Sequence, residues 1–154
     1  VVAADARCNR LSRMLMNDNL KPGQKVVSLA TAFRSTGFLS GALVTALCVW
    51  MITRDVLATG MALLVGAISG HLIATVISIF VYRTKDGTIP VVKTGASAIP
   101  TVLKATLPSA LVVGAILPVA VAFVMHAAVA SLIGYGLGVA LVSGVLLALL
   151  SALL

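Results

Sequence analysis

The stretch that decides the fold is Val56–Tyr82, which reads VLATGMALLVGAISGHLIATVISIFVY. It contains no Asp, Glu, Lys or Arg, and it is long enough to cross a hydrocarbon core of about 30 Å, for which a helix needs ~17–25 residues. Three similar blocks surround it in the chain: Gly37–Thr53, Ala105–Met125 and Ala127–Leu154. The first of them is short, but it extends back to Ser28 if the Arg34 side chain reaches the membrane interface.

The composition places the chain in the same class. Hydrophobic residues make up 60% of it and charged residues only 10%, whereas soluble domains carry about 45–50% apolar and roughly 25% charged residues. A water-soluble fold of 154 residues could not bury so much apolar surface. The sequence therefore predicts an all-α, membrane-type helical protein with four apolar helices.

The breaks between the blocks predict two tandem helical hairpins. The first turns at Thr53-Arg54-Asp55, a tip so short that its two helices must be in direct contact, and the second turns near His126. Four parts follow: a basic amphipathic segment at 1–27 with a short N-terminal helix, the first hairpin at 28–82, a basic polar loop at 83–104, and the second hairpin at 105–154. An offset of 70 residues aligns Arg34 with Lys104 and Gly66 with Gly136, which indicates either a tandem duplication or a chance similarity of apolar helices.

The charges are distributed unevenly along the chain. Eleven Lys and Arg stand against four acids, and all the basic residues except Arg54 lie before the first span or around the central loop. Because cytoplasmic loops are enriched in Lys and Arg, both termini and this loop are predicted to be cytoplasmic. The basic residues alternate with apolar ones and have no aromatic platform, which argues against nucleic acid as a direct ligand. Anionic lipid headgroups are the predicted partner, at Arg54, Arg83, Lys85, Lys93 and Lys104.

Glycines at helical spacing are the packing signal of the sequence. In lipid, helices associate through small residues that let backbones approach closely. Six glycines are assigned to helix packing, within one chain or between copies: Gly37, Gly41, Gly66, Gly70, Gly134 and Gly138. Ala140 and Gly144 continue the small face of the last span. Pro108 is expected in the first turn of the third span, whereas Pro118 is expected to kink it.

Catalytic residues are scarce. The chain has no Glu, and none of its four Asp lies inside a span; a Ser-His-Asp set and a phosphate-binding loop are absent as well. We therefore predict no enzyme activity, no cofactor and no metal, with phospholipid as the one molecule it could bind. His71 is the ionisable side chain nearest mid-membrane. It is either a hydrogen-bonded helix contact or a pore residue, in the latter case with Thr45, Ser69 and Thr75.

The stretch Gly41–Gly60, which reads GALVTALCVWMITRDVLATG, resembles the core of F-type conjugative pilins. The similarity covers residues 38–80, where those pilins also have an apolar helix, an aromatic-Met-x-Thr-basic tip and a second apolar helix. The resemblance implies a subunit stored in the bacterial inner membrane and assembled into the extracellular filament of a type IV secretion system. It also implies that Arg54 faces the filament lumen, with phospholipid between subunits. The second hairpin of this chain is a departure from that pattern.

The sequence thus predicts a non-enzymatic structural subunit that self-assembles as a homo-oligomer or joins a larger membrane-derived complex. A conjugative pilus subunit is its most specific form. The alternatives are a small four-helix membrane channel or transporter and an assembly factor for a membrane complex.

Overall fold

The computed structural model describes residues 26–82 and 91–153, and the prediction of an all-α, membrane-type protein with four apolar helices is confirmed. The helix predicted within residues 1–27 lies outside the described residues. The elements, in chain order, are β1 (Val26–Ser28), α2 (Leu29–Thr53), α3 (Val56–Val81), β2 (Val91–Lys93), the short 3-10 helix η1 (Ala96–Ala98), α4 (Ile99–Met125) and α5 (Val129–Leu153).

The first hairpin turns within two residues, because Arg54 caps the end of α2 and Asp55 caps the start of α3. Arg54 adopts the left-handed conformation, with φ of 55°, and its N–H donates to the Trp50 carbonyl at 3.0 Å. The Asp55 carboxylate then caps α3 by accepting from the N–H groups of Leu57 and Ala58 at 3.1 and 3.3 Å. A carboxylate at a helix N-terminus satisfies N–H groups that have no partner within the helix.

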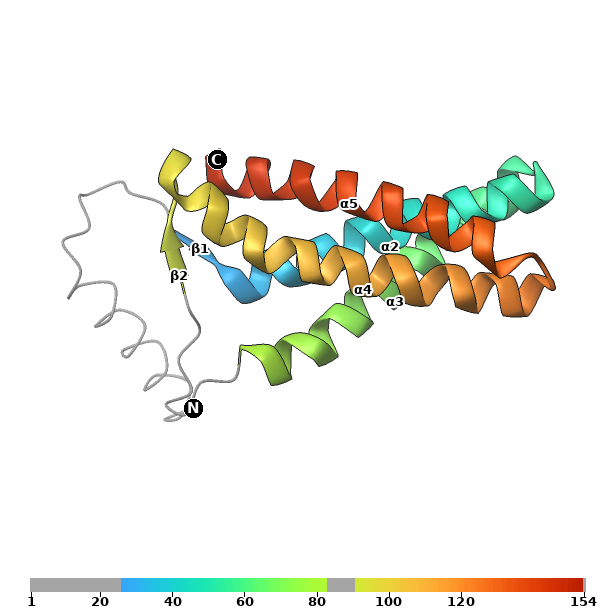
Figure 1. The fold of residues 1–154 in the computed structure, drawn as a ribbon, viewed down its shortest axis with the longest axis horizontal. Helices are drawn as coiled ribbons and strands as arrows, with labels where there is room; N and C mark the ends of the chain where they lie inside the picture. Colours follow the sequence, from blue (N-terminus) through green and yellow to red (C-terminus); the bar gives the residue numbers. More distant parts are fainter. Residues whose placement is uncertain (1–25, 83–90, 154) are drawn as a thin grey trace.

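The second hairpin also turns at a residue in the left-handed conformation. His126 ends α4 in the left-handed conformation, with φ of 50°, and its N–H is bonded to the Ala122 carbonyl. Only Ala127 and Ala128 then separate it from α5. Both tips lie at the same end of the molecule in Figure 1, so the four helices run alternately up and down.

Helix α4 begins at Ile99, six residues earlier than the predicted start at Ala105. Pro100 stands in its first turn, where proline has no N–H to lose and a favourable φ, so this residue of the loop predicted at 83–104 belongs to the start of the helix instead. Lys104 is therefore an exposed helical residue rather than the end of a loop. Pro108 lies inside the helix, so the prediction that placed it in the first turn of this span is wrong.

The end opposite the tips is closed by backbone hydrogen bonds. Strands β1 and β2 pair antiparallel, with Val27 opposite Val92. The Gly95 N–H donates to the Ala152 carbonyl at 2.7 Å, which attaches the segment before α4 to the last turn of α5. The start of α2, the start of α4 and the end of α5 therefore meet at one end of the bundle.

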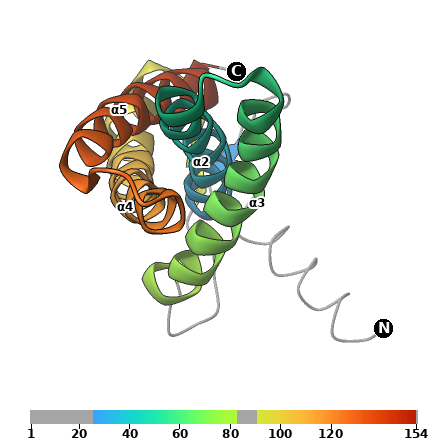
Figure 2. The same ribbon diagram turned by 90° about the vertical axis from the view of Figure 1, so that its right-hand side faces the viewer.

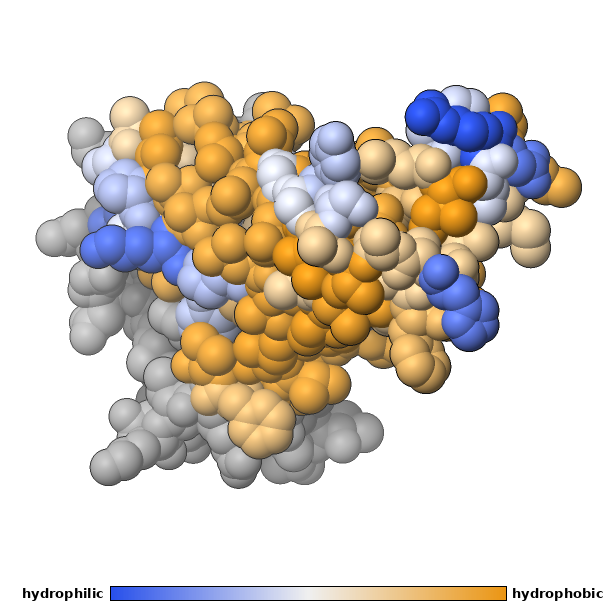
Figure 3. All heavy atoms as spheres, turned by 45° about the vertical axis from the view of Figure 1, so that its right-hand side comes forward, coloured by the Kyte–Doolittle hydropathy of each residue, from blue (hydrophilic) through white to orange (hydrophobic). Residues whose placement is uncertain are grey.

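Helix α2 is the centre of the bundle. It packs against α3, α4 and α5, whereas α3 packs along α2 and touches α4 only slightly. Figure 2 shows α3 on one side of α2 and the α4–α5 pair on the other. The exposed face seen in Figure 3 is mostly hydrophobic, with a paler patch near its middle, and its most hydrophilic residues lie toward the two ends, the distribution expected of a helical bundle in lipid.

Candidate functional site

Glycines bring the backbones of α2 and α3 into contact. A Cβ added to Gly37 would lie 2.6 Å from the Gly70 carbonyl oxygen, and one added to Gly41 would lie 2.8 Å from the Gly70 Cα. A Cβ on Gly66 would collide with the side chain of Thr45 and the carbonyl of Gly41. Four of the six glycines assigned to helix packing thus form one ladder of close contacts inside the first hairpin.

The second hairpin has a ladder of the same form. A Cβ added to Gly144 would lie 2.9 Å from the Ala110 Cβ, and one added to Gly114 would lie 2.6 Å from the Ala140 Cβ. A Cβ on Gly136 would meet the ring of Pro118. Gly114 was not among the predicted packing residues, although its place in the series Ala110, Gly114 and Pro118, at intervals of four residues, is a signal that could have identified it.

Gly134 and Gly138 do not take part in this ladder. Both are exposed, and a Cβ added at either position would meet nothing within 4 Å. Small residues surround α5 on several sides, so their spacing alone does not identify the face that meets α4. That face is the one with Gly136 and Gly144. Within the chain, therefore, the packing role predicted for Gly134 and Gly138 is not met.

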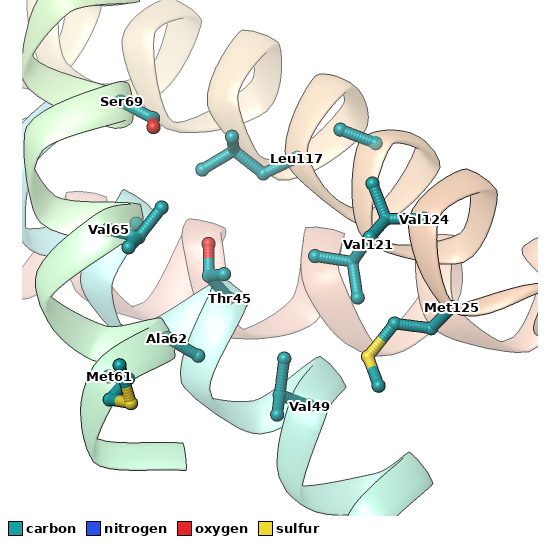
Figure 4. A pocket seen from close by; sticks show the side chains of 12 residues that line it. Thr45, Val49, Met61, Ala62, Val65, Ser69, Leu117, Val121, Val124 and Met125 are labelled. Atoms are coloured by element: carbon teal, nitrogen blue, oxygen red, sulfur yellow. The ribbon is translucent and has the colours of Figure 1, made fainter. Parts of the chain in front are cut away.

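A cavity of about 300 Å³ lies next to α2, between α3 and α4. It exists because the glycine ladder holds α3 against α2 and leaves most of α3 away from α4. Its walls are apolar, with Thr45 and Ser69 the two hydroxyl side chains among the residues that line it. Figure 4 shows the Thr45 oxygen pointing into the space between Val65 and Leu117.

Thr45 differs from the other buried hydroxyl residues of α2. The Thr36 and Ser40 hydroxyls donate to backbone carbonyls of their own helix at 2.8 and 2.5 Å, and the Ser109 hydroxyl of α4 donates to the Phe33 carbonyl of α2 at 2.7 Å. The Thr45 side chain is only 7% exposed and its Oγ1 has no hydrogen-bond partner in the described part of the chain. A buried hydroxyl without a partner costs roughly 1–3 kcal/mol.

The four residues of the predicted pore are not brought together. Thr45 and Ser69 line the cavity, but His71 is exposed on the outside of α3, where its ring lies edge-on to Phe38 at a centroid distance of 6.4 Å. Thr75 is half-buried, its hydroxyl has no hydrogen-bond partner among the residues that the structure describes, and it is not among the residues that line the cavity. Within one chain, therefore, His71 does not line a passage.

The basic residues assigned to lipid headgroups lie at the two ends of the bundle. Arg54 is exposed at the first tip, whereas Lys93 on β2 and Lys104 near the start of α4 are exposed at the opposite end. Arg83 and Lys85 lie outside the described residues. Exposed cations at the ends of membrane-crossing helices are placed where lipid phosphates lie.

One cation lies deeper within the helices. Arg34, in the second turn of α2, donates from Nε to the Ser78 hydroxyl of α3 at 2.9 Å. Ser78 in turn donates to the Thr75 carbonyl at 2.8 Å. The guanidinium is thus tied to the partner helix at the end of the hairpin that lies away from the tip, so that Arg34 contributes to the α2–α3 contact.

Few side chains among the described residues could support chemistry other than hydrogen bonding. In residues 26–82 and 91–153, no group of three or more His, Cys, Asp or Glu is positioned to hold a metal ion. No protein family, curated protein or solved structure was found to match the chain.

Proposed function

We propose that this chain is a non-enzymatic structural subunit of the membrane, which assembles with further copies of itself or joins a larger membrane-derived complex. The observation that carries the proposal is the unused glycine pair of α5. One small face of this helix, with Gly136 and Gly144, is buried against α4, whereas Gly134 and Gly138 are exposed on another face.

An exposed glycine pair is informative in a membrane because of what drives association there. Lipid tails are as apolar as leucine side chains, so hydrophobicity gives helices little reason to associate, and close backbone packing supplies the attraction. The α2–α3 ladder shows how closely this chain packs where glycines meet. Gly134 and Gly138 offer the same surface to a helix from outside the chain.

The pilin resemblance gives the proposal its most specific form. In this form the chain is stored in a bacterial inner membrane and assembles into a conjugative, type IV secretion filament, with phospholipid bound between subunits. Arg54, exposed at a tip of two residues, is available to face a lumen. The position of His71 on the outside of α3 favours assembly over a pore within one chain.

The test compares two exposed glycines, one on α5 and one on α3. Gly138→Leu should reduce the size of the assembly, measured by light scattering and negative-stain imaging of material extracted with its native lipid. Gly60→Leu is the matched control, because Gly60 is an exposed glycine of α3 with nothing within 4 Å of its added Cβ. A monomer in bilayers at every protein-to-lipid ratio would overturn the proposal. A discrete dimer with a water-filled centre would favour the channel or transporter.

A further inference from the structure

His71 is a polar side chain near the middle of a membrane-crossing helix. It comes 15 residues after the start of α3 at Val56 and ten before its end at Val81, which places it about 22 and 15 Å from the two ends at 1.5 Å per residue. If α3 is centred in a hydrocarbon core about 30 Å thick, the residue lies roughly 11 Å below the nearer surface. A histidine side chain is too short to reach the lipid headgroups from this depth.

The imidazole faces outward from the bundle. Gly70 meets α2, so the residues before and after it point to opposite flanks of that contact. Ser69 lines the cavity on the flank toward α4, whereas His71 is exposed on the other flank beside Phe38 of α2. In the described part of the chain the imidazole has an edge-on ring contact with Phe38 and no hydrogen-bond partner. Ionisable side chains within membrane spans almost always face protein or water, so a lipid-facing imidazole indicates a flank that another helix covers.

The exposed side chains of α3 continue on both sides of His71 at the spacing of a packed helix. Leu64, Ile68 and His71 are exposed at intervals of four and three residues, and the half-buried Thr75 follows after four more. This repeat of 3.5 residues on average keeps two helices in contact over several turns when they cross at a small angle. Only 28% of the most hydrophobic stretch of α3 is buried within the chain, the lowest share of the four spans. The helix therefore has both the spacing and the free surface for a neighbour from outside the chain.

A second copy of the chain supplies what the imidazole lacks. A neutral imidazole has one N–H donor and one nitrogen acceptor, so two of them complement each other. A twofold axis along the membrane normal brings each residue to its counterpart at the same depth, and twofold symmetry is the commonest in homo-oligomers. Among the described residues the exposed hydroxyl nearest in depth is that of Ser35, about 27 Å from the tip end against about 22 Å for His71. A copy would have to shift along the normal for Ser35 to meet His71, whereas two histidines meet without a shift.

We propose that two copies pair through parallel α3 helices, with His71 of one hydrogen-bonded to His71 of the other and with Leu64 and Ile68 packed beside this bond. One imidazole donates its N–H and the other accepts it. This inference extends the proposed function, since it adds a second interface to the one at Gly134 and Gly138. Figure 2 shows α5 and α3 on opposite sides of α2, so the two interfaces lie on different flanks, and together they continue an assembly beyond a dimer.

Cysteine cross-linking in native membranes tests the pairing. His71→Cys and Ile68→Cys are each made in a background with Cys8→Ser and Cys48→Ala, and the membranes are oxidised. We expect a disulfide-linked dimer from each variant, because a twofold axis places each residue opposite its own counterpart.

Two controls match the depth of His71 on other flanks. Ser69→Cys changes a residue of α3 that faces the cavity toward α4. Leu111→Cys changes an exposed residue of α4, 14 residues before the end of that helix at Met125 and hence about 21 Å from the tip end. Neither variant should form the dimer. Equal yields from His71→Cys and the two controls would indicate random collisions and would overturn the pairing.

Two substitutions of His71 test the hydrogen bond. His71→Leu keeps an apolar side chain but removes the hydrogen-bonding groups, whereas the amide of His71→Asn both donates and accepts. In the Ile68→Cys background, the protein-to-lipid ratio at half-maximal cross-linking should rise about three- to tenfold with leucine, the range of interhelical hydrogen bonds in membranes. Asparagine should restore most of this loss. If the leucine variant paired as tightly as the wild type, the imidazole would not be the recognition group and the proposal would fail.

The outcomes separate this inference from the proposed function. If His71→Cys formed no dimer while assemblies kept their size and Gly138→Leu still reduced it, the α3 pairing would be wrong and the proposed function would stand. Dimers through α3 without any larger assembly would support the pairing and contradict the contact at α5. A different membrane protein linked to His71→Cys would overturn the second copy as the occupant. Monomers at every protein-to-lipid ratio would overturn both proposals.

Discussion

Gly41→Ala should open the first hairpin. The added Cβ would collide with the Gly66 carbonyl and lie 2.8 Å from the Gly70 Cα, whereas carbon atoms in contact need about 3.5–4.0 Å. Helices α2 and α3 would have to separate by about 1 Å. If roughly 30–40 atom pairs then lose a quarter to a half of ~0.1–0.2 kcal/mol each, the cost is about 1–4 kcal/mol, consistent with measured costs of overpacking.

The assay is the free energy of unfolding in mixed micelles, measured by circular dichroism as the fraction of sodium dodecyl sulfate rises. Gly60→Ala is the matched control, because it makes the same change on α3 where the added Cβ meets nothing within 4 Å. It should be neutral or stabilising by up to about 1 kcal/mol through helix propensity. If the two variants unfolded at the same detergent fraction, the backbone contact between α2 and α3 would not be a source of stability.

Three further predictions follow from the same structure. Thr45→Val should stabilise the monomeric chain by about 1 kcal/mol, because it removes a buried hydroxyl without a partner; a lower unfolding midpoint of the monomer in mixed micelles would contradict this. Burial raises the pKa of the Tyr82 phenol, so the fold favours its neutral form. The stability that this phenol contributes should be complete below about pH 10 and lost as pH rises through the raised pKa. In Tyr82→Phe the free energy of unfolding, measured between pH 8 and 11, should therefore fall less with rising pH than in the wild type. Purified protein should retain phospholipid, detected by extraction and mass spectrometry, with headgroups at Arg54 in a filament or at Lys93 and Lys104 in a flat bilayer; a folded assembly without phospholipid would refute both arrangements.

The spans and tips could be predicted from the sequence because the signal is long and local. An uncharged apolar block, such as the one from Val56 to Tyr82, has one stable state in lipid, and a break of two or three residues leaves room only for a hairpin. The start of α4 could not be predicted in this way. Pro100 reads equally well as a loop residue and as the first turn of a helix, and Lys104 was counted with the loop because of its charge although an exposed lysine can extend from a helix to the interface.

The candidate site depends on a property that a sequence does not contain, namely which helices fail to touch. Thr45 and Ser69 were grouped by residue type and depth, and the structure brings both to one cavity. His71 was grouped with them on the same grounds, but it points away. The rotation of α3 about its axis decides between these outcomes, and that rotation is set by Gly66 and Gly70 meeting α2. Mean hydropathy is uniform around the helix and carries no such information.

The two hairpins have matching series of close contacts between their helices. Gly37, Gly41 and Thr45 face Ala74, Gly70 and Gly66 in the first, as Ala110, Gly114 and Pro118 face Gly144, Ala140 and Gly136 in the second. The offset is 73 residues in the first helix of each hairpin and 70 in the second. Helix starts and packing faces therefore align at different offsets, which explains why sequence comparison at one offset finds Gly136 but misses Gly114.

The two hairpins differ in chemistry at the third of these contacts, which pairs Thr45 with Gly66 in the first and Pro118 with Gly136 in the second. Proline at 118 fills the contact with an apolar ring, whereas threonine at 45 brings a hydroxyl to the same place and leaves it facing a cavity.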